Sequence, residues 1–499
     1  MSQPHRFGLV LLLALCLAAV KRPEVAIPTT EPGAISPPAA ETIPKAALGE
    51  MFRTELGAIY DPVQADQLID AHRLIEQYFL ARTAAERKSV VGQLEATEID
   101  PNVLGRLCRI RLHWPALPGG GVFYVNQKVG PRFCRYFLGV PKLYDRTKSW
   151  PMLVQLPEAT EFVSKPAPDA AKVVQIYAAW INAELVKHPD AIVLMPLLNL
   201  DDLYGPSYAG MNSVIDPVRD APERVNVDPA RVYLRGHSLG AVGVWQIALH
   251  YPTYFAAIDA LAGSATEEWQ QLRLMNLRNL LPIVWHDDND PIIKIGFART
   301  LVDALHSEKV PVQFDETKGL GHVPTTEIVE AEYQKMRATA RQLYPRQEWI
   351  QTNRPDVILN RTDWLQIYQA LSPGKEHIVP FRHGTGHMSL YTVTCSMKAT
   401  FANNRIDAIN DNVSTLRFYL NDQMANMAAP VQVVIDKKEK FKGLVKPSVG
   451  VMLKDQLVLG RGWRYFTGAI DIDMVSPPDT QPTTKPLHSG KILVGPKSQ

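Results

Sequence analysis

The sequence has few cysteines, no excess of charge of either sign and no long apolar segment. Only 4 of its 499 residues are cysteine, which excludes a small disulfide-bonded scaffold. Because 53 Lys and Arg residues nearly balance 51 Asp and Glu residues, the net charge of +2 gives no strong field for nucleic acid, and no nucleic-acid partner is expected. A chain of this length is too long for one hydrophobic core, so we expect more than one domain.

Three of the four cysteines, Cys108, Cys134 and Cys395, lie outside the N-terminal apolar run. They allow at most one internal disulfide and leave one thiol unpaired. A bond between Cys108 and Cys134 fits an oxidising compartment, but burial of each thiol as a small apolar group is the interpretation that we favour.

Residues 1–26 are typical of a signal peptide or an N-terminal anchor. His5 and Arg6 precede an apolar run, residues 8–20, that is too short to span a bilayer as a stable anchor. Within the run, the residues that lead to Cys16 partly resemble a bacterial lipobox, but Leu15 stands where a small residue is expected. We therefore expect a plain signal or an uncleaved anchor, and a protein that is secreted or held in the periplasm or cell envelope.

The remaining chain divides into five segments by composition and hydrophobic periodicity. They are a Pro-rich linker (27–45), an accessory helical segment (46–120), an alternating strand–helix domain (121–345), a β-rich domain (346–474) and a flexible tail (475–499). Strand–helix alternation predicts a doubly wound α/β fold with a mostly parallel sheet. Alternating apolar and polar residues beyond position 345 predict a small antiparallel domain of sandwich or barrel type.

The α/β domain is expected to contain six strands that alternate with six helices. The expected strands are 152–156, 191–196, 231–235, 256–261, 282–286 and 311–315. The expected helices are 169–187, 211–224, 239–250, 267–280, 293–306 and 325–343.

The strongest motif is Gly236-His-Ser238-Leu-Gly240, which follows a β-rich run and precedes a helical run. Alone, this pattern is also compatible with an ordinary tight strand-to-helix connection. In the context of strand, sharp turn and helix it indicates a nucleophile elbow, in which a serine is held at the sheet edge and glycines let strand and helix approach. We therefore identify Ser238 as the candidate nucleophile.

A serine nucleophile needs a base and an acid that orients the base, in the chain order Ser, Asp, His for such an elbow. Asp290 follows the expected strand 282–286 in a turn with Asp287 and Asp288. We favour Asp290 as the acid and keep Asp288 as the alternative, although all three also suit a polar, helix-capping turn. His322 lies on a Gly-rich loop after the last strand, which favours a base over an exposed loop histidine.

With these motifs in place, residues 135–343 resemble the esterase branch of the α/β-hydrolase superfamily. The resemblance is to polyhydroxybutyrate-depolymerase-like and feruloyl-esterase-like enzymes and, more distantly, to the prolyl oligopeptidase group. It rests on Asp228-Pro-Ala-Arg-Val-Tyr-Leu before the elbow, Tyr251-Pro-Thr-Tyr-Phe-Ala-Ala after it, and the turn from His286 to Asp290. The resemblance implies serine chemistry and does not specify the substrate.

Two positions depart from that family. Where the family has His-Gly in the loop that completes the oxyanion hole, this chain has Pro157 and Glu158, and proline has no N–H to donate. The expected donors are therefore the N–H of Leu239 and that of Glu158 or Ala159. Asp287 also stands where the family commonly has glycine, which adds negative charge near the site.

The sequence as a whole predicts an exported serine esterase that forms an acyl-enzyme with Ser238, Asp290 and His322 and needs no cofactor or metal. A prolyl-oligopeptidase-type peptidase and a catalytically weak scaffold remain as alternatives. Arg382-His383-Gly-Thr-Gly-His387 has histidines, but the glycines oppose a helical metal site. The substrate is a small or polymer-linked ester, and the C-terminal domain is a candidate for contact with glycan or the cell envelope.

Overall fold

The computed structural model describes residues 37–129, 132–158, 170–197, 208–354, 360–380 and 387–475. The predicted signal segment and residues 476–499 of the predicted tail lie outside these ranges. Within them, no helix is long and apolar enough to cross a membrane.

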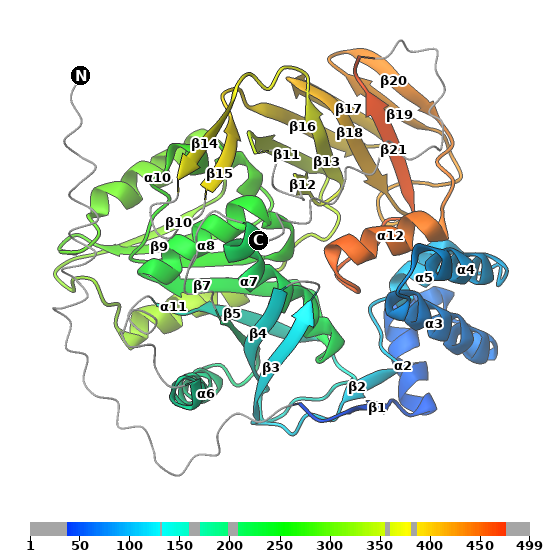
Figure 1. The fold of residues 1–499 in the computed structure, drawn as a ribbon, viewed down its shortest axis with the longest axis horizontal. Coiled ribbons are helices and arrows are strands. Elements are labelled where there is room, and N and C mark those ends of the chain that lie inside the picture. Colours follow the sequence, from blue (N-terminus) through cyan, green and yellow to red (C-terminus); the bar gives the residue numbers. More distant parts are fainter. Residues whose placement is uncertain are drawn as a thin grey trace, which may run out of the picture.

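An eight-stranded sheet forms the centre of the chain (Figure 1). Its strand order is β10-β9-β8-β7-β5-β6-β4-β3. The first six strands in this order are parallel to one another, whereas β4 runs antiparallel to both β6 and β3. The strands are β3 (Val122–Val129), β4 (Arg132–Gly139), β5 (Trp150–Leu156), β6 (Ile192–Pro196), β7 (Val227–His237), β8 (Ala257–Leu261), β9 (Leu281–Asp287) and β10 (Gln313–Thr317). The doubly wound, mostly parallel α/β prediction is confirmed.

Helices cover both faces of this sheet, because its central strands are apolar on both sides. In β5, Met152 and Val154 belong to the large core on one face, whereas Leu153 belongs to a smaller core on the other. The helices α7 (Tyr208–Asp220), α8 (Leu239–His250) and α10 (Ile295–Ser307) pack on the first face. The helices α6 (Ala170–Lys187) and α11 (Thr326–Arg337) pack on the second (Figure 1).

One predicted helix of this domain, 267–280, is wrong as a single element. The chain instead forms the short helix α9 (Glu268–Gln271) and a 3-10 turn, η6 (Leu274–Leu277). Between them, the buried Arg273 donates hydrogen bonds at 3.0 Å to Asn353 and Thr352. These contacts with the following domain outweigh the local helical propensity.

The N-terminal part contains the predicted helices and, in addition, a small two-stranded sheet. The helices are α2 (Lys45–Leu56), α3 (Ala65–Leu80), α4 (Ala84–Glu95) and α5 (Pro101–Leu107), with the 3-10 turns η1 (Gly57–Ile59) and η2 (Pro62–Gln64). Strand β1 (Ala40–Thr42) pairs with β2 (His113–Pro115), and the side chain of Ile43 is buried. The predicted linker 27–45 is therefore wrong at its C-terminal end, because residues 40–45 are folded against this segment.

The C-terminal part is a sandwich of two sheets that share one core. One sheet has the order β11-β16-β17-β19-β20 and the other β12-β13-β18-β21, with a separate hairpin β14–β15. The strands are β11 (Gln347–Thr352), β12 (Arg361–Thr362), β13 (Leu365–Ala370), β14 (Glu376–Pro380), β15 (His387–Tyr391), β16 (Cys395–Ala402), β17 (Arg405–Asp411), β18 (Val413–Leu420), β19 (Val431–Ile435), β20 (Lys438–Gly443) and β21 (Gly468–Asp473).

Two features of the C-terminal part differ from the expected antiparallel domain. Strands β17 and β19 pair in parallel, because a long connection, which contains β18, separates them in sequence. An unpredicted helix, α12 (Val449–Leu459), packs through Val449, Met452 and Leu453 into the core of the N-terminal helices (Figure 1). The first and last segments of the described chain are therefore built into one core.

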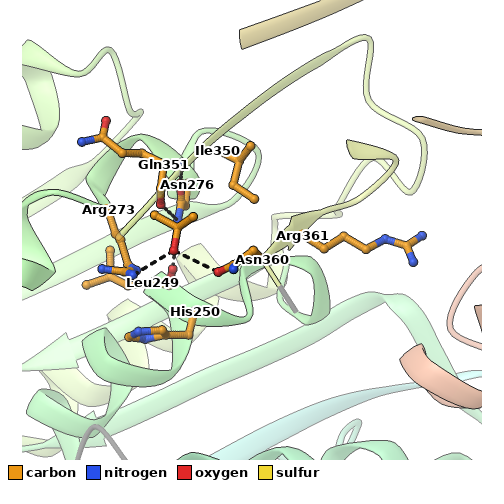
Figure 2. Close-up of a pocket in the computed structure, with 9 residues that line it drawn as sticks. Leu249, His250, Arg273, Asn276, Ile350, Gln351, Asn360 and Arg361 are labelled. Atoms are coloured by element: carbon orange, nitrogen blue, oxygen red, sulfur yellow. Dashed lines mark hydrogen bonds between the residues drawn. The ribbon is translucent and has the colours of Figure 1, made fainter. Parts of the chain in front are cut away.

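A polar joint connects the α/β domain to the sandwich (Figure 2). Asn276 donates to the carbonyl groups of Leu249 and Gln351 at 3.2 Å each and accepts the Gln351 N–H at 2.8 Å. The pocket at this joint holds only about 10 Å³, so it is a joint between domains and offers no room for a substrate.

The three cysteines of the described residues are buried and form no disulfide. Cys108 and Cys134 form no disulfide, which agrees with the favoured interpretation. Burial raises the pKa of the Cys108 thiol to about 11, so this thiol stays protonated and unreactive at neutral pH.

Candidate active site

Ser238 lies at the sharp turn between β7 and α8. Its backbone has φ of 56° and ψ of −118°, a left-handed conformation that is strained for a residue with a side chain. Its N–H donates to the Leu261 carbonyl of the neighbouring strand β8 at 2.9 Å, which fixes the turn at the carboxyl edge of the sheet. The predicted strand–turn–helix context of Ser238 is therefore present.

The two motif glycines are required by close backbone contacts. A Cβ atom on Gly236 would lie 2.3 Å from the carbonyl carbon of Gly240. A Cβ atom on Gly240 would lie 2.9 Å from the carbonyl oxygen of Leu156 at the end of β5. Both distances are too short for any side chain, so the steric reason inferred from the sequence holds at both positions.

The structure brings Ser238, His322 and Asp290 together in one hydrogen-bonded chain. His322 Nε2 lies 2.8 Å from Ser238 Oγ, and His322 Nδ1 lies 2.8 Å from Asp290 Oδ2. The His322 side chain is 9% exposed and that of Asp290 is fully buried. The arrangement lets a neutral imidazole accept the serine proton while the carboxylate holds the other ring nitrogen.

Asp290 is held by four groups. Its Oδ1 accepts the N–H groups of Ile292 and Ile293 at 2.8 and 3.0 Å, and its Oδ2 lies 3.2 Å from His286 Nε2 in addition to His322. Burial acts to raise the pKa of Asp290, but the hydrogen bonds from His286 and His322 outweigh burial and hold this pKa well below its usual range. Asp290 is therefore ionised at every pH at which the protein is expected to work.

The other two aspartates of the turn contact the loop that carries His322. Asp287 accepts hydrogen bonds from Gly321 N–H at 2.9 Å and from Thr317 Oγ1 at 2.8 Å. Asp288 is exposed and accepts the Gly319 N–H at 3.1 Å. Of the three aspartates, Asp290 is the one hydrogen-bonded to His322, and Asp288, the alternative acid, is directed to the loop backbone.

Two side chains at this site were missed from the sequence. His237, the last residue of β7, lies with Nδ1 2.6 Å from Glu158 Oε1 and with Nε2 2.8 Å from the backbone oxygen of His322. The rings of His237 and His322 are 4.9 Å apart between centroids. No sequence signal places Glu158 beside His237, because the two lie 79 residues apart.

The expected oxyanion donors are only partly described. Leu239 is the first residue of α8, so its N–H is among the helix-terminal donors that lack an intrahelical partner. Pro157 and Glu158 follow β5 at the same sheet edge. Ala159 lies outside the described residues.

Within the described ranges, no group of three His, Cys, Asp or Glu side chains is arranged to hold a metal ion. His377 lies on β14 and is exposed, and residues 381–386 of the His-rich motif are outside those ranges.

The sheet is mostly parallel, a nucleophile elbow follows a central strand, and an acid and a histidine later in the chain meet the serine. These features define the α/β-hydrolase fold. The chain therefore has this fold over its central part, with the helical segment before it and the β-sandwich after it.

Comparisons with known proteins found similar solved structures at low identity. No family model matches the sequence, and no curated protein matches it.

Among solved structures, the chain is similar to a thermostable esterase, with 20% identity over 44% of this chain and 63% of that chain and a TM-score of 0.37. It is similar to a feruloyl esterase module from Clostridium thermocellum, with 12% identity, 44% and 88% coverage and a TM-score of 0.31. It is also similar to a dipeptidyl peptidase 4 from Porphyromonas gingivalis, with 11% identity, 44% and 35% coverage and a TM-score of 0.35. The chain thus spans less than two thirds of the first esterase and about a third of the peptidase.

Proposed function

We propose that the protein is a serine hydrolase that cleaves carboxylic ester bonds through an acyl-enzyme. The observation that carries the proposal is the hydrogen-bonded chain from Ser238 Oγ through His322 to Asp290, with 2.8 Å at both steps. A serine hydroxyl is a weak nucleophile at neutral pH, and this arrangement supplies the base that activates it.

The reaction proceeds in two halves. His322 Nε2 takes the proton of Ser238 as Oγ attacks the ester carbonyl, and the imidazolium then gives this proton to the departing alcohol. In the second half a water molecule loses a proton to the same nitrogen and attacks the acyl-enzyme. The acid is released as the imidazolium returns this proton to Ser238 Oγ, which restores the serine and the neutral base. Asp290 stays ionised throughout and stabilises the imidazolium.

The N–H of Leu239 is the first donor to the tetrahedral oxyanion, and the N–H of Glu158 or Ala159 is the second. Pro157 occupies the position at which the related esterases have a donor-bearing loop residue, so the second donor comes from further along the chain. Because one lost donor costs about 100- to 1,000-fold in rate, this loop sets the catalytic power of the enzyme.

The test is covalent labelling of Ser238. Wild-type protein is expected to react with a fluorophosphonate probe and to hydrolyse p-nitrophenyl acetate, and Ser238→Ala is expected to do neither while keeping its circular dichroism spectrum. Ser264→Ala is the matched control, because the Ser264 hydroxyl donates to the Phe297 carbonyl at 3.1 Å. An unlabelled wild-type protein would identify a scaffold, and full activity in Ser238→Ala would exclude this serine.

Ester specificity is separated from peptidase activity by the substrate panel. We expect p-nitrophenyl and feruloyl esters to be turned over faster than prolyl peptides. The described segment before the catalytic domain is formed by four α-helices and a small sheet, and prolyl-oligopeptidase-type enzymes normally carry a β-propeller or similar gating domain there. Faster hydrolysis of the peptides would reverse the assignment.

We further propose that the protein is exported and that its β-sandwich contacts an acidic glycan of the cell envelope. A groove of about 870 Å³ lies over the outer face of the five-stranded sheet. Its Trp349 ring has Arg278 at 3.8 Å and Lys398 at 4.5 Å from the centroid. The groove is also lined by the cations Lys309, Lys437 and Arg405 and by the carboxylates Asp407 and Asp436, of which Asp407 pairs with Arg405, so the lining carries an excess of positive charge. Cations beside an aromatic ring suit a carboxylated sugar chain.

Calorimetric titration with polygalacturonate tests this contact. Trp349→Ala with Lys398→Ala is expected to abolish binding, whereas Tyr368→Ala, an exposed aromatic on the other sheet, is expected to leave it unchanged. Equal binding by all variants would remove the groove from consideration.

A further inference from the structure

The side chains of Glu158 and His237 form a pair that has no role in the reaction described above. Both side chains are largely buried, with 21% of Glu158 and 9% of His237 exposed. Glu158 follows β5, and His237 directly precedes the nucleophile on β7. The pair therefore lies between the oxyanion loop and the loop that carries His322.

Both partners of the His237 ring are hydrogen-bond acceptors. The oxygen at 2.8 Å from Nε2 is the backbone carbonyl of His322, which only accepts, so Nε2 must carry a proton. The group at 2.6 Å from Nδ1 is the carboxyl of Glu158. A carboxylate also only accepts, so this second contact requires a proton either on Nδ1 or on the carboxyl group.

Either location leads to the same count of protons. With a charged imidazolium and a carboxylate, or with a neutral imidazole and a carboxylic acid, the pair holds one proton more than neutral histidine and ionised glutamate would. Without that proton, either Nδ1 faces the Glu158 carboxylate with a lone pair or Nε2 faces the His322 carbonyl with one. In both cases one of the two hydrogen bonds is lost.

We propose that Glu158 and His237 are positioning residues that hold His322 in register with Ser238 through this shared proton, an inference that rests on the proposed hydrolase function. The His237 Nε2–H bond fixes the backbone of His322, whose ring makes the 2.8 Å contacts with Ser238 and Asp290. Without this bond the backbone of His322 is free to shift and the base is misaligned, and misplacement by about 1 Å costs about 100-fold in rate.

Few other titratable groups face this pair among the described residues. The His322 ring is 4.9 Å from that of His237. Asp290 binds the far side of the His322 ring, and Asp287 binds the N–H of Gly321 next to it. Burial acts to raise the pKa of both carboxylates, but the hydrogen bonds that they accept outweigh burial. Both pKa values therefore lie below the ordinary range, and both groups stay ionised.

The Glu158→Gln variant separates the shared proton from the contact itself. A glutamine amide N–H donates to Nδ1 of a neutral His237, whose Nε2–H still donates to the His322 carbonyl, so both bonds form without the extra proton. We expect Glu158→Gln to restore most of the kcat that Glu158→Leu loses, because the glutamine amide keeps the contact with His237. We expect Glu158→Leu and His237→Phe to lose about 10- to 100-fold in kcat at every pH, with KM within about threefold of wild type.

A kcat in Glu158→Gln as low as that in Glu158→Leu, or an undiminished kcat in both Glu158→Leu and His237→Phe, would overturn the proposal. If the apolar variants do not fold, as judged by circular dichroism, the magnetic resonance signals of His237 in wild type remain decisive.

A spectroscopic measurement keeps this inference distinct from the proposed function. In protein labelled with ¹⁵N-histidine, the His237 resonances, assigned by their loss in His237→Gln, are expected to show an exchange-protected Nε2–H and a hydrogen-bonded Nδ1. Absence of fluorophosphonate labelling in wild type would contradict the hydrolase proposal, whereas an unprotected Nε2–H of His237 in an enzyme that the probe labels would contradict only this inference.

Discussion

Replacement of Asp290 by asparagine tests the electrostatic core of the site. The asparagine side chain keeps an oxygen for the N–H groups of Ile292 and Ile293 but places an NH₂ group opposite His322 Nδ1. The imidazole then turns its Nδ1 lone pair to this amide and its proton sits on Nε2, where it faces Ser238 and cannot accept the serine proton. The loss expected from this wrong tautomer is about 10⁴-fold in kcat, or about 5.4 kcal/mol of transition-state stabilisation.

The assay is steady-state hydrolysis of p-nitrophenyl acetate, with circular dichroism as the check of fold. Asp288→Asn is the matched control, two residues away in the same turn. Its carboxylate is exposed and accepts one backbone hydrogen bond from Gly319, so its loss should be below about tenfold. A larger loss in Asp288→Asn than in Asp290→Asn, or more than about a hundredth of wild-type kcat in Asp290→Asn, would refute the assignment of the acid.

Three further predictions concern stability, each measured by urea unfolding. Gly236→Ala should lower the free energy of unfolding by at least about 2 kcal/mol because its Cβ meets backbone, whereas Gly296→Ala, with open space around it, should not. Asp363→Ala should cost about 3 to 5 kcal/mol because it leaves the buried Arg341 and Arg464 without their anion, and the exposed Asp407→Ala at most about 1 kcal/mol. Burial raises the pKa of Glu332 to about 8, so the folded state holds a proton that the unfolded state releases near its ordinary pKa. The free energy of unfolding of wild type should therefore fall as the pH rises from about 4.5 to 8, and Glu332→Gln should lack this fall.

The features that were predicted from the sequence are those that depend on local pattern. The strands of the sheet read as apolar runs because both of their faces are buried, and the elbow reads as Gly-x-Ser-x-Gly because Gly236 and Gly240 have no space for a side chain. The order of Ser238, Asp290 and His322 follows from strand ends that share one edge of a parallel sheet. Such regularities need no knowledge of distant contacts.

The features that were missed depend on contacts between distant segments. Helix α12 was not expected because Leu457 and Val458 are exposed while Val449 and Met452 are buried, so its apolar residues show no single helical face. The strand β1 was read as linker because its three residues are exposed and polar or small, and the pairing with β2 becomes visible only in three dimensions. The contact of Glu158 with His237 belongs to the same class.

The sequence and the structure lead to opposite interpretations of Asp287. From the sequence, its carboxylate in place of a glycine adds negative charge beside the acid and makes the choice between aspartates less secure. In the structure, the side chain is buried, and it accepts hydrogen bonds from Thr317, Asn289 and Gly321, so its charge is satisfied within the loop. The Gly321 N–H adjoins His322, so Asp287 fixes the backbone before the base, and His237 contacts the carbonyl of His322 itself. Asp287, which replaces the glycine common in the esterases that the sequence resembles, thus stabilises the loop that carries His322. The different roles of the three aspartates follow from the groups to which each carboxylate is hydrogen-bonded.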